Sequence, residues 1–248
     1  MLRFKFILVC LCAFGSLSAT TFHLLMWADT LDSNISRASK IDLSLVHKEA
    51  LRVALKLGYD LDEVIIDGTE LTRVNARNSL DQMQVEGEDI IFFYYTGHGS
   101  RGKNKNDKWP EFYLAGSRER MDFSFVKASL SKKNPRFILA IADCCNNFRS
   151  QTVKKEIMSL ASSGHSQWLA NLHTLFLGKT QAVFISAASP GEYAWAYENQ
   201  GGVFTLSFFE YFRKLLGNTN PITWELILSK VQKDISCFQN PQFEIISY

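Results

Sequence analysis

Short apolar runs alternate with amphipathic stretches along most of the chain. Apolar runs bounded by turn-forming residues predict strands, and these lie at residues 21–28, 63–66, 89–99, 112–115, 137–143, 181–188 and 243–247. Apolar residues that recur at roughly every third or fourth position predict helices, at residues 44–57, 72–84, 122–130, 203–216 and 221–235. Strands that alternate with helices in this way indicate an α/β fold, in which helices cover a mainly parallel sheet.

Two stretches between these elements lack a clear period. Residues 29–41 are polar and are interpreted as a loop, so the first helix is expected to begin near Ser44, a suitable N-cap, and to end at Gly58. Residues 149–179 have mixed patterning. They either form a mobile segment or hold two helices, at residues 153–160 and 168–177.

The first 19 residues, MLRFKFILVCLCAFGSLSA, have a basic start, an apolar middle and small residues at the end. This pattern is typical of a signal peptide that is cleaved after Ser18 or Ala19. The alternatives are an uncleaved membrane anchor and a buried first strand. We therefore expect a signal peptide at residues 1–19, one folded domain at residues 20–248, and a secreted or periplasmic protein.

Composition narrows the range of partners. Removal of Arg3 and Lys5 with the leader would leave 25 basic residues against 25 acidic ones, which gives a nucleic-acid partner no electrostatic support. No segment after the leader has the length and apolar character of a membrane span. The cysteines that would remain do not resemble a disulfide framework, because only three are left and two are adjacent: Cys144, Cys145 and Cys237.

Two predicted strands end in residues that can carry nucleophilic catalysis. The run DIIFFYYTGHG places His98 between two glycines, and the run FILAIAD is followed by Cys144 and Cys145. Ligands of open α/β sheets bind beyond the carboxyl ends of the strands, so both groups are expected at one edge of the sheet. A thiol and an imidazole at one site are the components of an activated cysteine nucleophile. The remaining histidines have no motif around them and are interpreted as structural: His23, His47, His165 and His173.

These stretches together resemble the caspase-like cysteine peptidases, which include caspases, metacaspases and paracaspases. Cys145 follows His98 by 47 residues, and the caspase signature places its histidine about 50 residues upstream of the cysteine. YYTGHGS resembles the family's histidine motif, ADCC resembles the metacaspase Asp-x-Cys motif, and SAASPGEYAW at residues 186–195 is similar to the substrate loop of animal caspases. The resemblance implies a three-layer sandwich with a mainly parallel, six-stranded sheet flanked by helices.

The resemblance also implies catalytic roles. Cys145 would be the nucleophile and His98 would take its proton. The backbone N–H groups of Gly99 and Cys145 would then hold the oxyanion of the acyl intermediate. No metal or other cofactor is needed for this chemistry, and the substrate would be a peptide or a protein.

Substrate-binding roles follow from the same resemblance. Asp143 would lie at the base of the first substrate pocket and select Arg or Lys; alternatively, it caps the end of its strand. Tyr193 and Trp195 would wall the substrate cleft, and the backbone near Ala194 would pair with an extended peptide.

Several residues depart from the family pattern. Cys145 is followed by Asn146-Asn147-Phe148 without the usual glycine, which leaves the geometry of that loop open. The metacaspase Asn-Asp pair would fall near residues 46–48, Val-His-Lys, so a second acidic pocket residue is expected to be missing. Residues 148–157 lack the acidic calcium ligands of metacaspases, so no calcium requirement is expected. Two functions therefore stay open: a cysteine endopeptidase, and a catalytically silent caspase-like module that binds a peptide or a partner.

Overall fold

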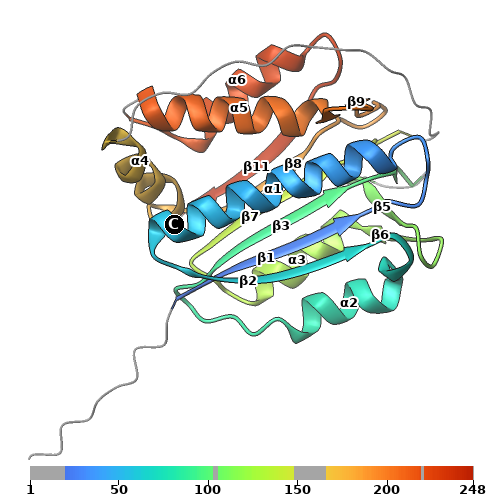
Figure 1. Cartoon of the computed structure of the whole chain (residues 1–248), viewed down its shortest axis with the longest axis horizontal. Coiled ribbons are helices and arrows are strands. Elements are labelled where there is room, and N and C mark those ends of the chain that lie inside the picture. Colours follow the sequence, from blue (N-terminus) through green and yellow to red (C-terminus); the bar gives the residue numbers. More distant parts are fainter. Residues whose placement is uncertain (1–19, 103–105, 148–165, 219–220, 248) are drawn as a thin grey trace, which may run out of the picture.

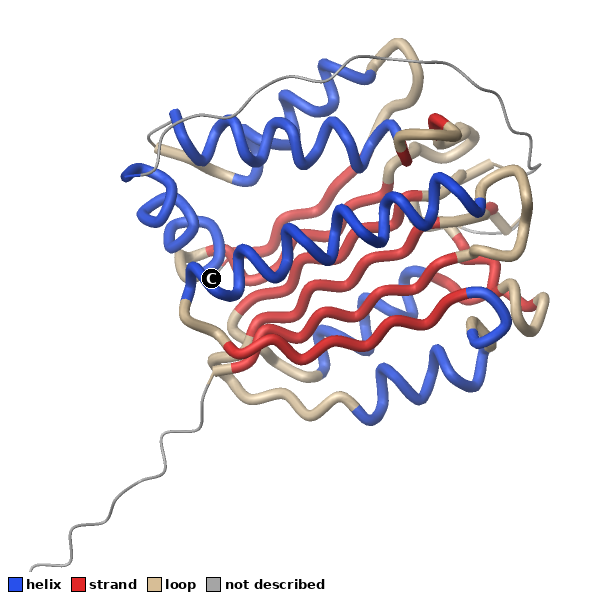
Figure 2. Tube along the Cα trace, in the orientation of Figure 1, coloured by secondary structure: helices blue, strands red, loops and turns tan. Residues whose placement is uncertain are grey.

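Six of the predicted strands pair into one sheet in the computed structural model, which describes residues 20–102, 106–147, 166–218 and 221–247. The strand order is β11-β8-β7-β3-β1-β2 (Figure 2). Every neighbouring pair is parallel except β11 and β8, which run antiparallel. The strands are β1 (Thr21–Ala28), β2 (Asp60–Asp67), β3 (Ile90–Thr96), β7 (Phe137–Asp143), β8 (Thr180–Ser186) and β11 (Gln242–Ser247). This confirms the predicted mainly parallel, six-stranded α/β sandwich.

Helices cover both faces of the sheet, because its strands present apolar side chains alternately to two cores. On β1, Phe22, Leu24 and Met26 face one core, whereas Leu25 and Trp27 face the other. The first core is covered by α1 (Ser36–Leu57), α4 (Ser166–Phe176), α5 (Val203–Asn218) and α6 (Trp224–Ile235) (Figure 1). The second core is covered by α2 (Arg73–Gln82) and α3 (Phe123–Lys132).

Short elements cluster beyond the carboxyl ends of the central strands. Strands β4 (Gly99–Ser100), β5 (Glu111–Leu114) and β6 (Glu119–Asp122) form a three-stranded sheet, of which the sequence predicted only the middle strand. A second small sheet pairs β9 (Ala196–Tyr197) with β10 (Gly201–Gly202). A single 3-10 turn, η1 (Gly68–Glu70), precedes α2.

The predicted start of the first helix was wrong. Helix α1 begins at Ser36, eight residues before Ser44, and so replaces part of the predicted loop. Its first turns carry buried polar side chains on the inner face, including Ser39 and Asp42, and these interrupt the apolar pattern. The predicted end is confirmed, since Gly58 adopts a left-handed conformation with φ of 77° and its N–H caps the helix.

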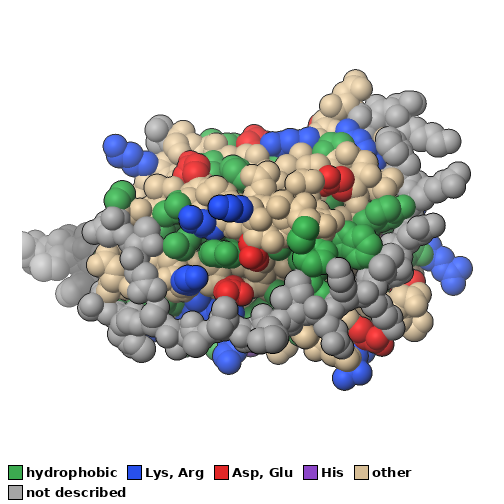
Figure 3. Space-filling view, turned by 90° about the horizontal axis from the view of Figure 1, so that it is seen from above, with side chains coloured by type: hydrophobic (Ala, Val, Ile, Leu, Met, Phe, Trp, Pro, Cys, Tyr) green, Lys and Arg blue, Asp and Glu red, His purple; other side chains and the backbone are tan. Residues whose placement is uncertain are grey.

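Other boundaries shifted less. Strand β2 is longer than residues 63–66. It is an edge strand, and three of its four additional residues, at positions 60–62 and 67, are aspartates that interrupt the apolar pattern. The predicted helix at residues 168–177 corresponds to α4, whereas the predicted helix at 153–160 and the leader at 1–19 lie outside the described residues. None of the helices in the described part of the chain combines the length and apolar character of a membrane span. On the face shown in Figure 3, basic and acidic side chains are interspersed rather than gathered by sign.

Candidate active site

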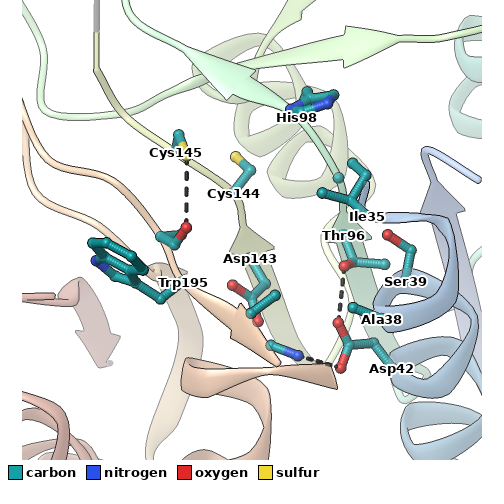
Figure 4. A pocket seen from close by; sticks show the side chains of 14 residues that line it. Ile35, Ala38, Ser39, Asp42, Thr96, His98, Asp143, Cys144, Cys145 and Trp195 are labelled. Carbon is teal, nitrogen blue, oxygen red and sulfur yellow. Dashed lines mark hydrogen bonds between the residues drawn. The ribbon is translucent and has the colours of Figure 1, made fainter. Parts of the chain in front are cut away.

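Strands β3 and β7 bring the histidine and cysteine motifs to one edge of the sheet. The two strands pair directly, with Thr96 opposite Asp143 as the last register position. Gly97 and Cys144 therefore leave the sheet side by side, as expected for parallel strands of equal length. The ends of these strands open into a pocket that combines α1, both strand ends and the segment around β9 and β10 (Figure 4). The pocket is lined by Ile35, Ala38, Ser39, Asp42, Thr96, Gly97, His98, Asp143, Cys144, Cys145, Ala194, Trp195, Ala196 and Gly202.

Cys145 lies at this pocket with only a small part of its surface exposed. Its thiol donates a hydrogen bond to the backbone carbonyl of Ala194, with 3.7 Å between sulfur and oxygen (Figure 4). Burial raises the pKa of the Cys145 thiol, so the resting group is protonated at neutral pH. Nucleophilic chemistry at this sulfur therefore requires a base that removes the proton.

His98 lies at the same pocket and is the one histidine among the residues that line it, so it is the candidate for that base. Its side chain is partly exposed, and Nε2 lies 3.0 Å from Oδ2 of Asp32. Asp32 follows β1, so a third strand end contributes to the site. Its role could not be recognised in the sequence, because Asp32 and His98 are separated by 66 positions.

Glycines at two positions allow the chain to pass close to the cysteine pair. A Cβ atom at Gly99 would lie 2.3 Å from the carbonyl oxygen of Cys145 and 2.5 Å from Sγ of Cys144. Gly97 has φ of 150°, and a Cβ there would lie 2.6 Å from Cβ of Asp29. The Gly-His-Gly motif is therefore explained by close packing between the strand ends, in addition to any role in binding a ligand.

Cys144 and Cys145 occupy different environments. Cys144 is buried in the core under α2 and α3, and burial raises its thiol pKa well above the ordinary value. Cys145 lies in the pocket, where its sulfur faces the segment around Ala194. Neither cysteine forms a disulfide within the described residues. The accessible thiol is thus the one that the Asp-x-Cys motif selects.

Two buried carboxylates, Asp42 and Asp143, form the part of the pocket nearest the sheet (Figure 4). Asp143 accepts hydrogen bonds at Oδ2 from Thr205, at 3.2 Å from the backbone nitrogen and 2.6 Å from the hydroxyl. Asp42 accepts hydrogen bonds from the Thr96 hydroxyl at 3.0 Å and the Gly202 N–H at 2.8 Å. The expectation that a second acidic pocket residue is missing was therefore wrong. It followed from the misplaced start of α1, which left Asp42 between the predicted loop at residues 29–41 and the predicted helix at 44–57.

Burial shifts the ionisation of both carboxyl groups. It raises the pKa of Asp143 to about 6. It also raises the pKa of Asp42 well above its ordinary value, and the nearby charge of Asp143 adds to that shift. Gly202 lies between the two carboxyl groups, because a Cβ there would be 2.2 Å from Oδ2 of Asp143 and 3.3 Å from Oδ2 of Asp42. Burial therefore favours the protonated form of both carboxyl groups as long as no positive charge lies beside them.

The segment predicted to wall the substrate cleft is only partly in the pocket. Ala194 and Trp195 line it, whereas Tyr193 is not among the lining residues. Trp195 is fixed through its backbone, since its N–H donates to Oε1 of Gln239 at 2.8 Å and its carbonyl accepts from Val203 at 2.9 Å. Those two backbone groups are thus occupied within the protein.

Asn146 anchors the loop after Cys145, in which the usual glycine of the family pattern is absent. Its backbone N–H donates to the carbonyl of Glu192 at 3.0 Å, and its carbonyl accepts from Gly191 at 2.8 Å. Its buried side-chain amide donates to the carbonyls of Lys108 and Ala188, at 2.8 and 3.3 Å. Asn146 therefore holds the loop in place through hydrogen bonds to four backbone groups.

Comparisons with known proteins agree with this architecture. A family model described as the caspase domain matches residues 44–247. A solved structure of a protein from Geobacter sulfurreducens is similar in fold, with a TM-score of 0.55 and 12% sequence identity, over 92% of this chain and 94% of that one. A comparison with curated proteins found no match.

Proposed function

Because the chain belongs to the caspase-domain family of cysteine peptidases, we propose that it is an endopeptidase with Cys145 as nucleophile and His98 as base. We further propose that it cleaves after Arg or Lys. The observation that best supports this specificity is the pair of buried carboxylates in the pocket that also contains Cys145.

The proposed reaction is acyl transfer through a thioester. His98 takes the thiol proton of Cys145, and the thiolate attacks the carbonyl carbon of the scissile peptide bond. Backbone N–H groups of Gly99 and Cys145 are the proposed donors to the oxyanion. His98 then gives its proton to the leaving amine, the C–N bond breaks, and water hydrolyses the thioester to release the second product.

The specificity argument is electrostatic. A buried carboxylate is costly unless it is protonated or paired with an opposite charge. Asp42 and Asp143 have threonine and backbone donors, all of them neutral. A guanidinium or ammonium group in the pocket would supply the missing charge, and a guanidinium can bond to carboxylates through two N–H groups at once. An acidic side chain would be repelled.

The test is cleavage of matched fluorogenic peptides that differ only in the residue before the scissile bond. We expect kcat/KM for Arg or Lys to exceed that for Gln by about 10²-fold, since charged hydrogen bonds in buried sites contribute up to about 3 kcal/mol. Asp143→Asn should remove most of this preference. Asp122→Asn is the matched control, because Asp122 caps α3, outside the pocket, and asparagine caps a helix equally well.

Each alternative predicts a different result. Preference for Asp before the scissile bond would contradict the proposed specificity while keeping the peptidase assignment. Binding of Arg peptides without hydrolysis, in reducing buffer, would instead support the silent binding module.

A further inference from the structure

The ring of His98 is held by a carboxylate that is itself held firmly in place. Nε2 of His98 lies 3.0 Å from Oδ2 of Asp32. The other carboxylate oxygen, Oδ1, accepts hydrogen bonds from the backbone N–H of Asn34 at 2.8 Å and from its side-chain amide at 3.0 Å. The carbonyl of Asp32 accepts from Ile35 and Ser36 at the start of α1. The side chain therefore uses one oxygen for its own turn and presents the other to the imidazole.

The charge on Asp32 suits contact with an imidazole. Its hydrogen bond from the Asn34 N–H, together with His98, lowers the pKa of the Asp32 carboxyl, so the group is ionised at neutral pH. A carboxylate can only accept at this contact, so Nε2 must carry the hydrogen. In the neutral ring, Nδ1 is then the basic nitrogen that exchanges a proton with a substrate or a nucleophile.

A second carboxylate near the ring has a different character. Asp29 is buried, and burial raises its pKa, although the nearby His98 opposes that shift. Its Oδ1 accepts from the N–H of Leu31 at 3.2 Å, and its buried Oδ2 has no hydrogen-bond partner within the described residues. Asp32 is thus the carboxylate with both the direct contact to the ring and the charge to stabilise it.

We propose that Asp32 is the positioning residue of a Cys145–His98–Asp32 triad, which fixes the Nε2–H form of His98 and stabilises the protonated ring. The proposal rests on the proposed function, because the triad would serve the same peptide hydrolysis. It also extends beyond the part of the chain that the family comparison covers, since the matched region begins at residue 44. Burial keeps the Cys145 thiol protonated at rest, so a fixed negative charge behind His98 would favour transfer of that proton to the ring.

The first test is Asp32→Asn, which keeps the size of the side chain and an oxygen that can still accept from Asn34. It removes the charge and allows an amide N–H to face Nε2, which favours the wrong form of the ring. We expect kcat for an Arg peptide to fall by on the order of 10²-fold or more, with KM within about threefold of wild type. The pH profile of kcat should shift as well, because the charge next to the base is lost.

Asp62→Asn is the matched control. The carboxylate of Asp62 also contacts a histidine ring, since its Oδ2 lies 2.9 Å from Nδ1 of His23. This contact lies near the amino ends of β1 and β2, away from the pocket. This variant should keep kcat and its pH profile. An Asp32→Asn variant with kcat within about twofold of wild type would overturn the proposal.

A second readout does not depend on turnover. Nitrogen-15 NMR of the His98 side chain in wild type, at a pH where the ring is neutral, should show the hydrogen on Nε2. A hydrogen on Nδ1 would overturn the proposal, whether or not Asp32→Asn folds. If wild type hydrolyses no peptide at all, the proposed function fails, while the NMR result still decides whether Asp32 fixes the ring.

Discussion

Two pairs of aspartates lie at opposite ends of the strands. A histidine side chain, that of His23, lies between the two members of one pair, whereas no such base lies between the described members of the other pair. At the amino ends of the strands, His23 contacts Asp62 at 2.9 Å through Nδ1 and Asp89 at 3.2 Å through Nε2. At the carboxyl ends, Asp42 and Asp143 receive hydrogen bonds from threonines and backbone N–H groups. Within the described part of the chain, no Lys, Arg or His side chain bonds to that second pair.

The difference separates a structural site from the proposed binding site. In the first pair, each carboxylate already has a side-chain partner within the chain, because the two ring nitrogens of His23 contact Asp62 and Asp89. The second pair, Asp42 and Asp143, has no positively charged partner within the described residues. Buried carboxylates need a compensating charge, which a bound proton or an external cation would supply. The second pair also lies beside a thiol and a second histidine. A histidine with carboxylate partners is therefore not diagnostic by itself; the groups that share its edge of the sheet decide its role.

Among substitutions at these two sites, the largest expected effect is on the stability of the folded protein and comes from the loss of His23. His23→Leu would remove the side-chain partner of the buried Asp89 carboxylate, which would keep only the backbone N–H donors of Thr21 and Glu86. Loss of a hydrogen-bond partner by a buried polar group costs about 1 to 3 kcal/mol of unfolding free energy. Denaturant unfolding measures the loss, and kcat of the remaining folded protein should be unchanged. A stable His23→Leu protein without activity would place His23 in the catalytic machinery and contradict the comparison.

The second pair should instead make stability depend on pH. Burial raises the pKa of Asp143 to about 6, so the folded state binds more protons than the unfolded state between about pH 4 and pH 6. The free energy of unfolding of the substrate-free protein should therefore fall as pH rises through this range, by on the order of 2 kcal/mol.

Asp143→Asn provides the control for this pH dependence, because it removes one of the two buried carboxyl groups and should make the slope in this range smaller. Denaturant unfolding at a series of pH values compares the two proteins. Equal slopes would show that Asp143 is not the source of the pH dependence.

The smallest effect is expected at Cys144. Its thiol is buried in the core under α2 and α3, and less of the residue is exposed than of Cys145, although both cysteines line the pocket. Cys144→Ala should cost about 1 kcal/mol of stability, as removal of a small buried group does. Hydrolysis should be retained, and loss of activity in this variant with retention in Cys145→Ala would reverse the assignment of the nucleophile.

The sequence predicted the central strands well and the pocket only in part. Strands β3 and β7 are buried on both faces, so each is a continuous apolar run that cannot be overlooked. The start of helix α1 was misplaced because Ser39 and Asp42 are polar but buried on its inner face. Polar residues that serve a site break the periodicity on which helix prediction depends.

The same limit applies to individual site residues. His98 and Cys145 could be found, because each follows a buried strand that ends in an unusual local motif. Asp32 and Asp42 could not, since their partners His98 and Gly202 are 66 and 160 positions away. Long-range contacts of this kind depend on how β1, β3 and β7 pair. The sequence predicts the class of fold to which these strands belong, but not which residues the pairing brings together.

The most direct measurement of the central claim is covalent labelling by a peptide inhibitor that ends in Arg and carries a thiol-reactive group. Mass spectrometry of wild type in reducing buffer should show one adduct, on the peptide that contains Cys145. Cys144→Ala should be labelled at a similar rate, Asp143→Asn more slowly, and Cys145→Ala not at all. No adduct in wild type, or an adduct that persists in Cys145→Ala, would contradict the account.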